Sequence, residues 1–298
     1  MTHRFAALLT AIVLASIVAC GDSAMKRVED PFSGGYPLYR DEASGLDVIF
    51  GTPDLGTGPQ RLAFALISRD GIVRDPTVDI EVSGSGETQV LTARYQPFPT
   101  GTRGVYVAEA TFAKAGRRTI QVAVPRPEGK AARLGFPIDV ATKPSSVAVG
   151  DRAPASRNRL ASDVASLAEL TTSTVPEASL YRMRIADAVA AGRPFVVVFA
   201  SPAFCTTPLC GPQVEDLAIL AKDYAGRAEF IHIDLYENPH EIKGDLARAR
   251  RSPLLKDWGL QTDEWTFVVA PDGRVAARFE AYAGRDEVES ALKNVLGR

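Results

Sequence analysis

The chain has 298 residues, a formal net charge of −2 and an isoelectric point near 6.0. This length is sufficient for two modest domains, each with an apolar core. This charge balance argues against a nucleic-acid binder, which would show a basic face, so no nucleic-acid partner is expected. A short basic cluster around Arg250 is flanked by Asp245 and Asp257 and is typical of a solvated helix face.

The chain begins with an uninterrupted apolar run at residues 5–19 (FAALLTAIVLASIVA), preceded by His3 and Arg4. The run is shorter than the roughly 20 residues that span a membrane, and it fits the apolar region of an export signal. Residues 17–20 (IVAC) resemble a bacterial lipobox. That resemblance implies a signal peptide at residues 1–19 and acylation of Cys20, which becomes the mature N-terminus. The alternative is an ordinary cleaved signal with an incidental cysteine.

A lipid on Cys20 is the expected membrane attachment, because no second apolar segment approaches spanning length. Two or more acyl chains give stable anchoring. We therefore expect residues 20–40 to form a tether, and the folded part to lie on the outer side of the cytoplasmic membrane or in a periplasm. Thiols in that compartment are usually oxidised, so Cys205 and Cys210 are expected to form a disulfide.

Residues 41–142 show short runs of period two separated by turn signals, such as Val78, Ile80 and Val82 alternating with polar residues. About seven such strands predict an antiparallel β-sandwich of immunoglobulin or fibronectin type. Residues 104–122 (GVYVAEATFAKAGRRTIQV) resemble the late hairpin of these domains. The segment contains no Cys and no His, so it offers no catalytic or metal-binding group. A spacer and a binding module both remain open.

Residues 143–160 are rich in Pro, Ser and Gly and predict a linker, and the pattern changes in residues 161–298. Residues 194–200 (PFVVVFA) are typical of a strand buried on both faces. A helix is expected around residues 214–224, a strand at 229–235, helix at 240–258 broken at Pro253, strands at 265–270 and 275–279, and a last helix near Asp286. This β-α-β-α-β-β-α order predicts a mixed α/β sheet covered by helices.

The order of these elements, with a cysteine pair where the first buried strand meets its helix, resembles the thioredoxin fold over roughly the last hundred residues. The residues that carry the resemblance are 196–214 (VVVFASPAFCTTPLCGPQV), and residues 149–154 (VGDRAP) resemble the lead-in of membrane-anchored thioredoxin-like proteins and redoxins. The resemblance implies that Cys205 and Cys210 are catalytic and exchange disulfides with protein thiols, without a cofactor. A helix N-terminus favours the thiolate, and the second thiol resolves the mixed disulfide.

The cysteine spacing departs from the family, since this chain has C-x4-C where thioredoxins have C-x2-C. In a continuous helix, positions five apart point about 140° away from each other, so residues 206–209 must be partly loop. Pro208 then suits a first helical position, with Thr207 as the cap. Cys210 begins a C-G-P-Q copy of the family's C-G-P-C, whereas Cys205 lies at the strand exit. Either cysteine is therefore a candidate nucleophile.

The expected substrate cleft also departs from the family. Thioredoxins have a cis-proline before the third strand, whereas residues 262–266 (TDEWT) contain no proline. A trans bond is expected there, because a cis bond without proline costs about 3 kcal/mol. We expect Trp265, Thr266 and Pro212 to form the cleft. The aliphatic residues 196–198 leave no buried acid in the first strand.

Four alternatives remain open. A thiol peroxidase would place Thr207 three residues before a peroxidatic Cys210, with Arg274 or Arg278 as the cation. A copper carrier would use the soft thiolates with His232 or His240. No Met cluster supports copper, and no metal site is predicted. A structural disulfide and a partner-binding lipoprotein without redox activity are the other two.

Overall fold

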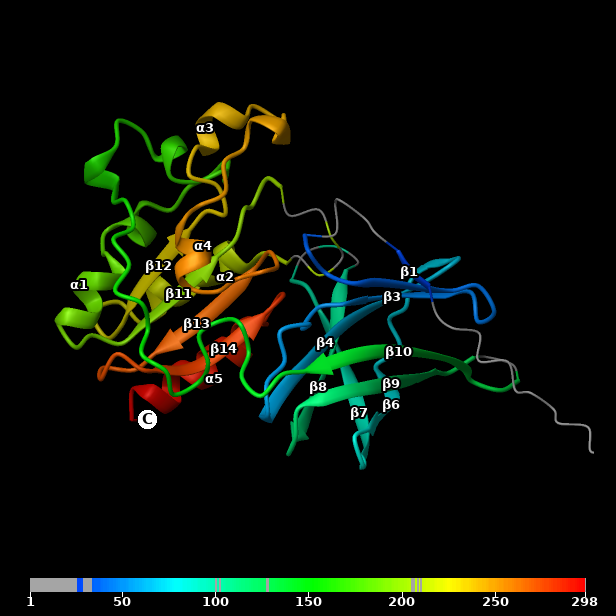
Figure 1. Ribbon diagram of the computed structural model, residues 1–298. Coiled ribbons are helices and arrows are strands. Elements are labelled where there is room, and N and C mark those ends of the chain that lie inside the picture. Colours follow the sequence, from blue (N-terminus) through cyan, green and yellow to red (C-terminus); the bar gives the residue numbers. More distant parts are fainter. Residues whose placement is uncertain are drawn as a thin grey trace, which may run out of the picture.

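The computed structural model describes residues 26–28, 34–99, 101, 103–126, 129–204, 207, 209 and 211–297. This part of the chain forms two lobes, each built on its own β-sheet (Figure 1). The expected signal peptide and Cys20 lie outside the described residues, as do Cys205 and Cys210. No helix in the described ranges is long and apolar enough to cross a membrane.

The N-terminal lobe is one ten-stranded antiparallel sheet in the order β1-β2-β3-β4-β8-β7-β6-β9-β10, with β5 paired to β4. Its strands are β1 (Lys26–Val28), β2 (Leu38–Asp41), β3 (Leu46–Phe50), β4 (Gly58–Ser68), β5 (Gly71–Ile72), β6 (Thr77–Gly84), β7 (Glu87–Pro97), β8 (Gly104–Phe112), β9 (Gly116–Val124) and β10 (Ala132–Val140). Strand β7 pairs with β6 up to Arg94 and with β8 from Arg94 onward. The sheet therefore bends at β7 and curls.

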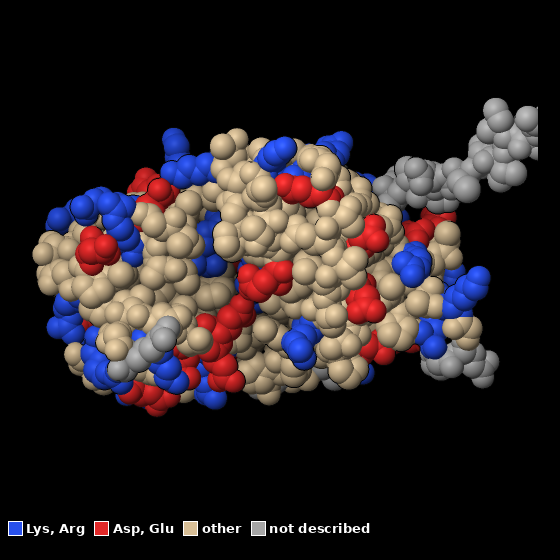
Figure 2. Space-filling model, turned by 90° about the horizontal axis from the view of Figure 1, so that it is seen from below, with Lys and Arg blue, Asp and Glu red and all other residues tan. Residues whose placement is uncertain are grey.

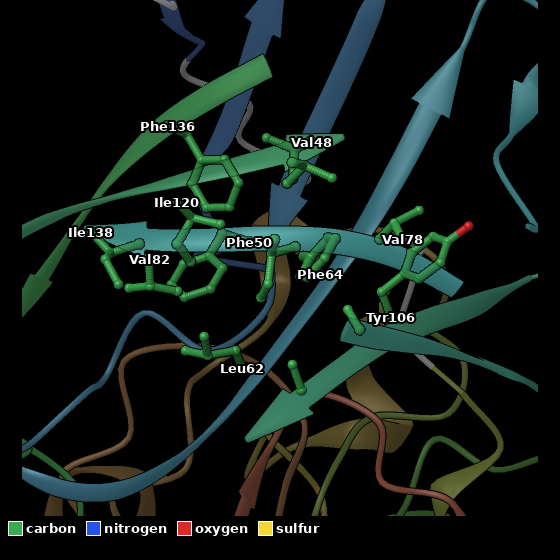
Figure 3. Close-up of a cluster of buried hydrophobic side chains, with 14 of the residues drawn as sticks. Val48, Phe50, Leu62, Phe64, Val78, Val82, Tyr106, Ile120, Phe136 and Ile138 are labelled. Atoms are coloured by element: carbon green, nitrogen blue, oxygen red, sulfur yellow. The ribbon is translucent and has the colours of Figure 1, made fainter. Parts of the chain in front are cut away.

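The inner faces of the curled sheet enclose an apolar core (Figure 3). Phe64 of β4 stacks on Tyr106 of β8 with ring centroids 5.5 Å apart. Tyr39 of β2 stacks on Phe136 of β10 at the same separation, although the two strands lie far apart in the sheet order. The Tyr39 hydroxyl also donates to the carbonyl of Pro137 at 3.2 Å. These contacts bring β2 against β10 and close the curl around the core.

The alternating pattern of the sequence correctly marks the buried side of β6, where Val78, Ile80 and Val82 are all buried.

Two expectations for the N-terminal lobe differ from the structure. A β-sandwich has two separate sheets, whereas here β7 pairs with both β6 and β8 and joins the two layers into one continuous sheet. The predicted tether, residues 20–40, contains β1 and the start of β2, which pair with each other. Strands this short give no periodic signal, and buried Tyr36 and Tyr39 fix the segment through tertiary contacts.

The C-terminal lobe is a four-stranded sheet in the order β12-β11-β13-β14, with β11 parallel to β12 and antiparallel to β13. Its strands are β11 (Phe195–Phe199), β12 (Glu229–Ile233), β13 (Trp265–Val269) and β14 (Val275–Glu280), and its α-helices are α1 (Ile185–Ala190), α2 (Gln213–Asp223), α3 (Pro239–Ile242), α4 (Leu254–Asp257) and α5 (Arg285–Val295). Short 3-10 turns are η1 (Ala161–Asp163), η2 (Leu167–Glu169), η3 (Ala178–Tyr181) and η4 (Leu246–Arg248). The predicted order of the four strands, with one long helix after the first strand and one after the last, is confirmed.

Helices cover both faces of this sheet, as expected of a sheet whose central strand is apolar throughout. Helices α2 and α5 pack with Val196 and Val198 on one face. Helices α1 and α4 pack with Phe195, Val197 and Phe199 on the other. The helix expected at residues 240–258 is only two single turns, α3 and α4, with η4 and extended chain between them.

The predicted linker contains no helix and no strand between β10 and η1, but backbone hydrogen bonds fix it against both lobes. The amides of Ser145 and Ser146 donate to the carboxylate of Asp54, in the N-terminal lobe. The amide of Val147 donates to the carbonyl of Trp258, and that of Ala153 to the carbonyl of Gly273. The segment therefore acts as a strap rather than as a free spacer.

The two lobes are joined by buried polar contacts. The Arg61 guanidinium of β4 binds the Glu287 carboxylate of α5 at 2.7 Å and donates to the carbonyls of Glu280 and Tyr282. Arg278 of β14 binds Asp54 at 3.0 Å. Figure 2 shows acidic side chains gathered along the junction of the lobes when the molecule is seen from below. The relative position of the lobes is therefore fixed by several specific contacts.

Candidate functional site

The loop between β11 and α2 carries both predicted cysteines and leaves the carboxyl end of the central strand. Cys205, Thr206, Pro208 and Cys210 lie outside the described residues, but residues 200–204, 207, 209, 211 and 212 on either side are described. Helix α2 begins at Gln213, after Pro212, so the expected helix start at Pro208 is wrong. Locally, the Thr207 hydroxyl accepts the amide of Leu209 at 3.3 Å, which closes a turn instead of capping a helix.

The start of the loop is fixed by a buried polar network. The Asp234 carboxylate, just after β12, accepts the amide and the hydroxyl of Thr172 at 2.7 and 2.9 Å. The Thr172 hydroxyl lies 3.0 Å from that of Ser201 and accepts the amide of Ala203 at 3.2 Å. Burial raises the pKa of Asp234 to about 6. This network holds the chain where it leaves β11 toward Cys205.

His232 lies beneath this network on β12 and is buried. Its Nδ1 lies 2.7 Å from the Tyr181 hydroxyl and its Nε2 lies 3.0 Å from the carbonyl of Ala200. Burial lowers the pKa of His232 to about 4, so the ring is neutral at physiological pH. Because both ring nitrogens are hydrogen-bonded within the core, His232 has a structural role there. Nε2 of His240, on α3, lies 3.9 Å from Oε1 of the neighbouring Glu241.

The end of the loop is held by the N-terminal lobe. Leu209 is fully buried in a cluster that contains Ile49, Ala63 and Val105 from that lobe and Tyr282 from the other. Nearby, the Phe98 and Tyr282 rings meet edge-on with centroids 4.5 Å apart. Sequence patterns do not indicate the packing of Leu209 against the N-terminal lobe, because a single apolar residue in a loop carries no periodic signal. The N-terminal lobe is therefore part of the wall around the cysteine loop.

Arg103 extends this wall from the turn that precedes β8. Its guanidinium donates to the carbonyl of Thr207 at 3.2 Å, midway between the two cysteines in sequence. The same guanidinium lies 5.9 Å from the centre of the Phe98 ring. A cation beside a cysteine loop favours thiolates over thiols. The cation that the structure brings to this loop thus comes from the N-terminal lobe.

Gly211, which follows Cys210 directly, packs without room for a side chain. A Cβ atom there would lie 2.2 Å from Cδ2 of the Tyr282 ring, which is far inside contact distance. The absence of a side chain lets the backbone approach Tyr282 and Glu264 closely. The amide of Gly211 donates to Oε1 of Glu264 at 3.2 Å. The end of the loop is therefore tied to the residue just before β13.

Glu264 is the candidate site residue that sequence reasoning misses. Its side chain is buried, and its backbone has φ of 63°, a left-handed conformation that is unusual for a residue other than glycine. Burial raises the pKa of Glu264 well above the ordinary value of 4.5. In the sequence it reads as an exposed turn residue beside Asp263. Only the fold turns its carboxyl group toward the cysteine loop.

A cavity of about 190 Å³ lies between the loop and the N-terminal lobe. Its lining residues come from both lobes and from both ends of the loop: Phe98, Arg103, Ala200, Ser201, Pro202, Gly211, Pro212, Val214, Glu215 and Glu264. The cavity is large enough to hold water. At this cavity the fold brings together polar groups from both lobes beside the described ends of the loop.

Of the three predicted cleft residues, only Pro212 lines this cavity. Trp265 is buried in the core, where its indole N–H donates to the carbonyl and hydroxyl of Thr262 and its ring stacks on Phe267. Thr266 is buried opposite Val198 on the neighbouring strand. The prediction that Trp265 and Thr266 form the cleft is therefore wrong. These adjacent side chains point to opposite faces of the sheet, and both faces are covered, so both are buried, whereas the preceding Glu264 contacts the loop.

The arginines suggested for a peroxidase lie elsewhere. Arg274 donates to the carbonyl of Gly150 at 2.6 Å, and Arg278 binds Asp54 and Ser146 at the junction of the lobes. Neither lines the cavity. Across the described ranges, no group of three or more His, Cys, Asp or Glu side chains is arranged to hold a metal ion.

Comparison with known proteins gives a likeness to solved structures. No protein-family model matches the chain, and no curated protein matches it. A solved thiol:disulfide interchange protein of the thioredoxin family from Chlorobium tepidum TLS is similar with 18% sequence identity and a TM-score of 0.29. The similarity covers 37% of this chain and 84% of that chain. The thioredoxin-like fold of the C-terminal lobe follows from its own strand order and strand directions.

Proposed function

We propose that the chain is a lipid-anchored protein outside the cytoplasm that exchanges disulfides with protein thiols through Cys205 and Cys210. Cys20 carries the lipid, residues 1–19 are the signal peptide, and the N-terminal lobe is an immunoglobulin-like domain. One observation carries the proposal. The two cysteines belong to the loop between the buried strand β11 and helix α2, beside a cavity with a buried carboxyl group.

The chemistry follows from the surroundings of the loop. A partner thiolate attacks one sulfur of the disulfide, and the second cysteine leaves as a thiolate. The positive end of the α2 dipole and the Arg103 guanidinium, which donates to the carbonyl of Thr207 in the loop, both favour that negative charge. The second partner thiol then releases the reduced pair. The N-terminal lobe narrows access to the loop, which favours particular partners over general disulfide reduction.

The test is the reduction potential of the pair in a soluble chain of residues 21–298, which retains both lobes. Alkylation after equilibration in graded dithiol buffers measures the fraction reduced. We expect a value between about −270 and −120 mV, the range of redox-active pairs. Cys205→Ser and Cys210→Ser identify the attacking cysteine, because only the variant that keeps it accumulates mixed disulfides. A pair that is still oxidised below about −300 mV would be a structural staple and would refute the proposal.

A further inference from the structure

A second cavity, of about 180 Å³, lies at the outer edge of the C-terminal sheet and shares no lining residue with the cavity beside the cysteine loop. The strand at that edge is β12, and Ile233 of β12 and Asp234 just after it form part of the wall. A water molecule needs only about 10–15 Å³ of such volume, so this cavity has room for a small organic molecule.

Hydrogen bonds within the protein hold the walls of this edge cavity in place. Asn158 accepts the amide of Ile185 at 2.8 Å and donates to the carbonyl of Met183 at 3.1 Å. The Tyr181 hydroxyl lies 2.7 Å from Nδ1 of His232. Because Asn158, Tyr181 and His232 all line the edge cavity, its shape exists before any molecule binds, as is usual for small-molecule sites.

Much of the wall of the edge cavity is apolar. The side chains of Leu170, Ile233 and Leu254 contribute to it. Leu170 belongs to the core on one face of the sheet, whereas Ile233 belongs to the core on the other face and Leu254 packs against that core. The edge cavity therefore lies where the two cores meet, and its apolar wall favours a molecule with a compact apolar body.

The carboxyl groups that line the edge cavity already have partners within the protein. Glu169 and Glu237 each bind an arginine, with nitrogen–oxygen distances of 2.9 and 2.8 Å. Asp234 accepts two hydrogen bonds from Thr172 and one from the amide of Tyr236. A cationic molecule would therefore meet no unpaired carboxylate in this wall.

Two other polar groups of the wall have no partner within the part of the chain that the structure describes. Ser252 is only 8% exposed and lines the edge cavity, and its hydroxyl forms no hydrogen bond with a described residue. Arg157 is exposed and also lines the cavity, and its guanidinium forms neither an ion pair nor a hydrogen bond there. A buried hydroxyl without a partner is unfavourable, and a bound acceptor removes that cost. Both groups are donors, so they suit an anion.

We propose that the edge cavity binds a small organic carboxylate with a compact apolar body, held by Arg157 and Ser252. The guanidinium and the hydroxyl donate to the carboxylate, since arginine matches the two oxygens of a carboxylate with parallel hydrogen bonds. The apolar body packs against Leu170, Ile233 and Leu254. This site is separate from the proposed disulfide exchange, and neither depends on the other.

Titration calorimetry of the chain of residues 21–298 tests the site with three probes of the same ring and different charge: benzoate, benzyl alcohol and benzylamine. We expect one benzoate to bind per chain. Benzyl alcohol should bind at least about tenfold more weakly, because a hydrogen bond to a charged group is stronger than one between neutral groups. Benzylamine should give no detectable binding, since it places a cation beside Arg157.

Arg157→Gln should weaken benzoate binding at least about tenfold and leave the binding of benzyl alcohol unchanged. Arg182→Gln is the matched control, because Arg182 is also exposed and also has no partner among the described residues, but does not line the edge cavity. It should bind benzoate as the wild type does. Ser252→Ala should weaken benzoate binding about fivefold, the effect of one hydrogen bond.

Three results would overturn the inference. The first is a wild-type chain that gives no saturable heat with millimolar benzoate. The second is equal benzoate affinity in Arg157→Gln and Arg182→Gln, which would mean that any attraction comes from the overall charge of the surface. The third is tighter binding of benzylamine than of benzoate, which would assign the edge cavity to a cation. Circular dichroism of each variant verifies that it is folded before its affinity is compared.

Discussion

Arg61→Met is expected to weaken the attachment of the two lobes. The guanidinium makes two hydrogen bonds to the Glu287 carboxylate, at 2.7 and 3.1 Å, and one each to the carbonyls of Glu280 and Tyr282. The Arg61 side chain is only 7% exposed and that of Glu287 is 21% exposed. Methionine fills a similar volume but leaves these acceptors without their donor. Breaking a buried pair in this way costs about 3 kcal/mol.

Urea unfolding of the chain with both lobes measures this cost. Both tryptophans, Trp258 and Trp265, belong to the C-terminal lobe, so their fluorescence follows that lobe alone, while circular dichroism follows both. We expect the fluorescence transition of the variant to move to lower urea and to separate from the transition of the other lobe.

The matched control is Arg117→Met, which removes an exposed ion pair with Asp139 in the N-terminal lobe. Arg117 is 73% exposed, and exposed pairs of this kind contribute little to stability. If Arg61→Met loses no more stability than Arg117→Met, and its two probes still report one transition, the Arg61 contacts do not hold the lobes together and the reasoning is refuted.

Three further outcomes are expected. Leu209→Ala should cost about 2–5 kcal/mol in urea unfolding because it empties a buried position, and a loss below about 1 kcal/mol would contradict the anchoring of the loop. Trp265→Phe should lower stability by about 1 kcal/mol through the lost hydrogen bonds to Thr262 but leave the exchange rate unchanged; a slower exchange would restore Trp265 to the cleft. Burial raises the pKa of Glu280 to about 8, so the folded state holds the Glu280 proton more tightly than the unfolded state does. The stability of the fold should therefore fall as the pH rises from about 4.5 through 8. Glu280→Gln should flatten that fall, as measured by thermal unfolding at each pH.

The order of strands and helices in the C-terminal lobe could be predicted because it depends on local patterns. Residues 195–199 are apolar throughout, and α2 carries apolar residues at helical spacing. The start of α2 could not be placed correctly, because Pro208 and Pro212 are both compatible with a first turn. The choice between them depends on Gly211, which packs against Tyr282 and Glu264.

The candidate site is only partly predictable from the sequence, because it too depends on tertiary contacts. Pro212 lies beside the cysteine pair in sequence, and its place at the cavity follows from that proximity. The sequence predicts a cleft at Trp265 and Thr266 because they follow the position of the missing proline. All five residues of β13 are buried because helices cover both faces of the sheet, and that coverage is a tertiary feature.

The sequence by itself determined what repeats or is contiguous: the alternation of the N-terminal strands, the buried strand β11, and the two cysteines at the junction of β11 and α2. Only the tertiary structure decided what surrounds that junction. Glu264, Arg103 and Leu209 come from separate parts of the chain, and each resembles an ordinary turn or loop residue in the sequence. They meet because the lobes dock through specific buried contacts, and such contacts between distant residues leave no periodic signal in the chain.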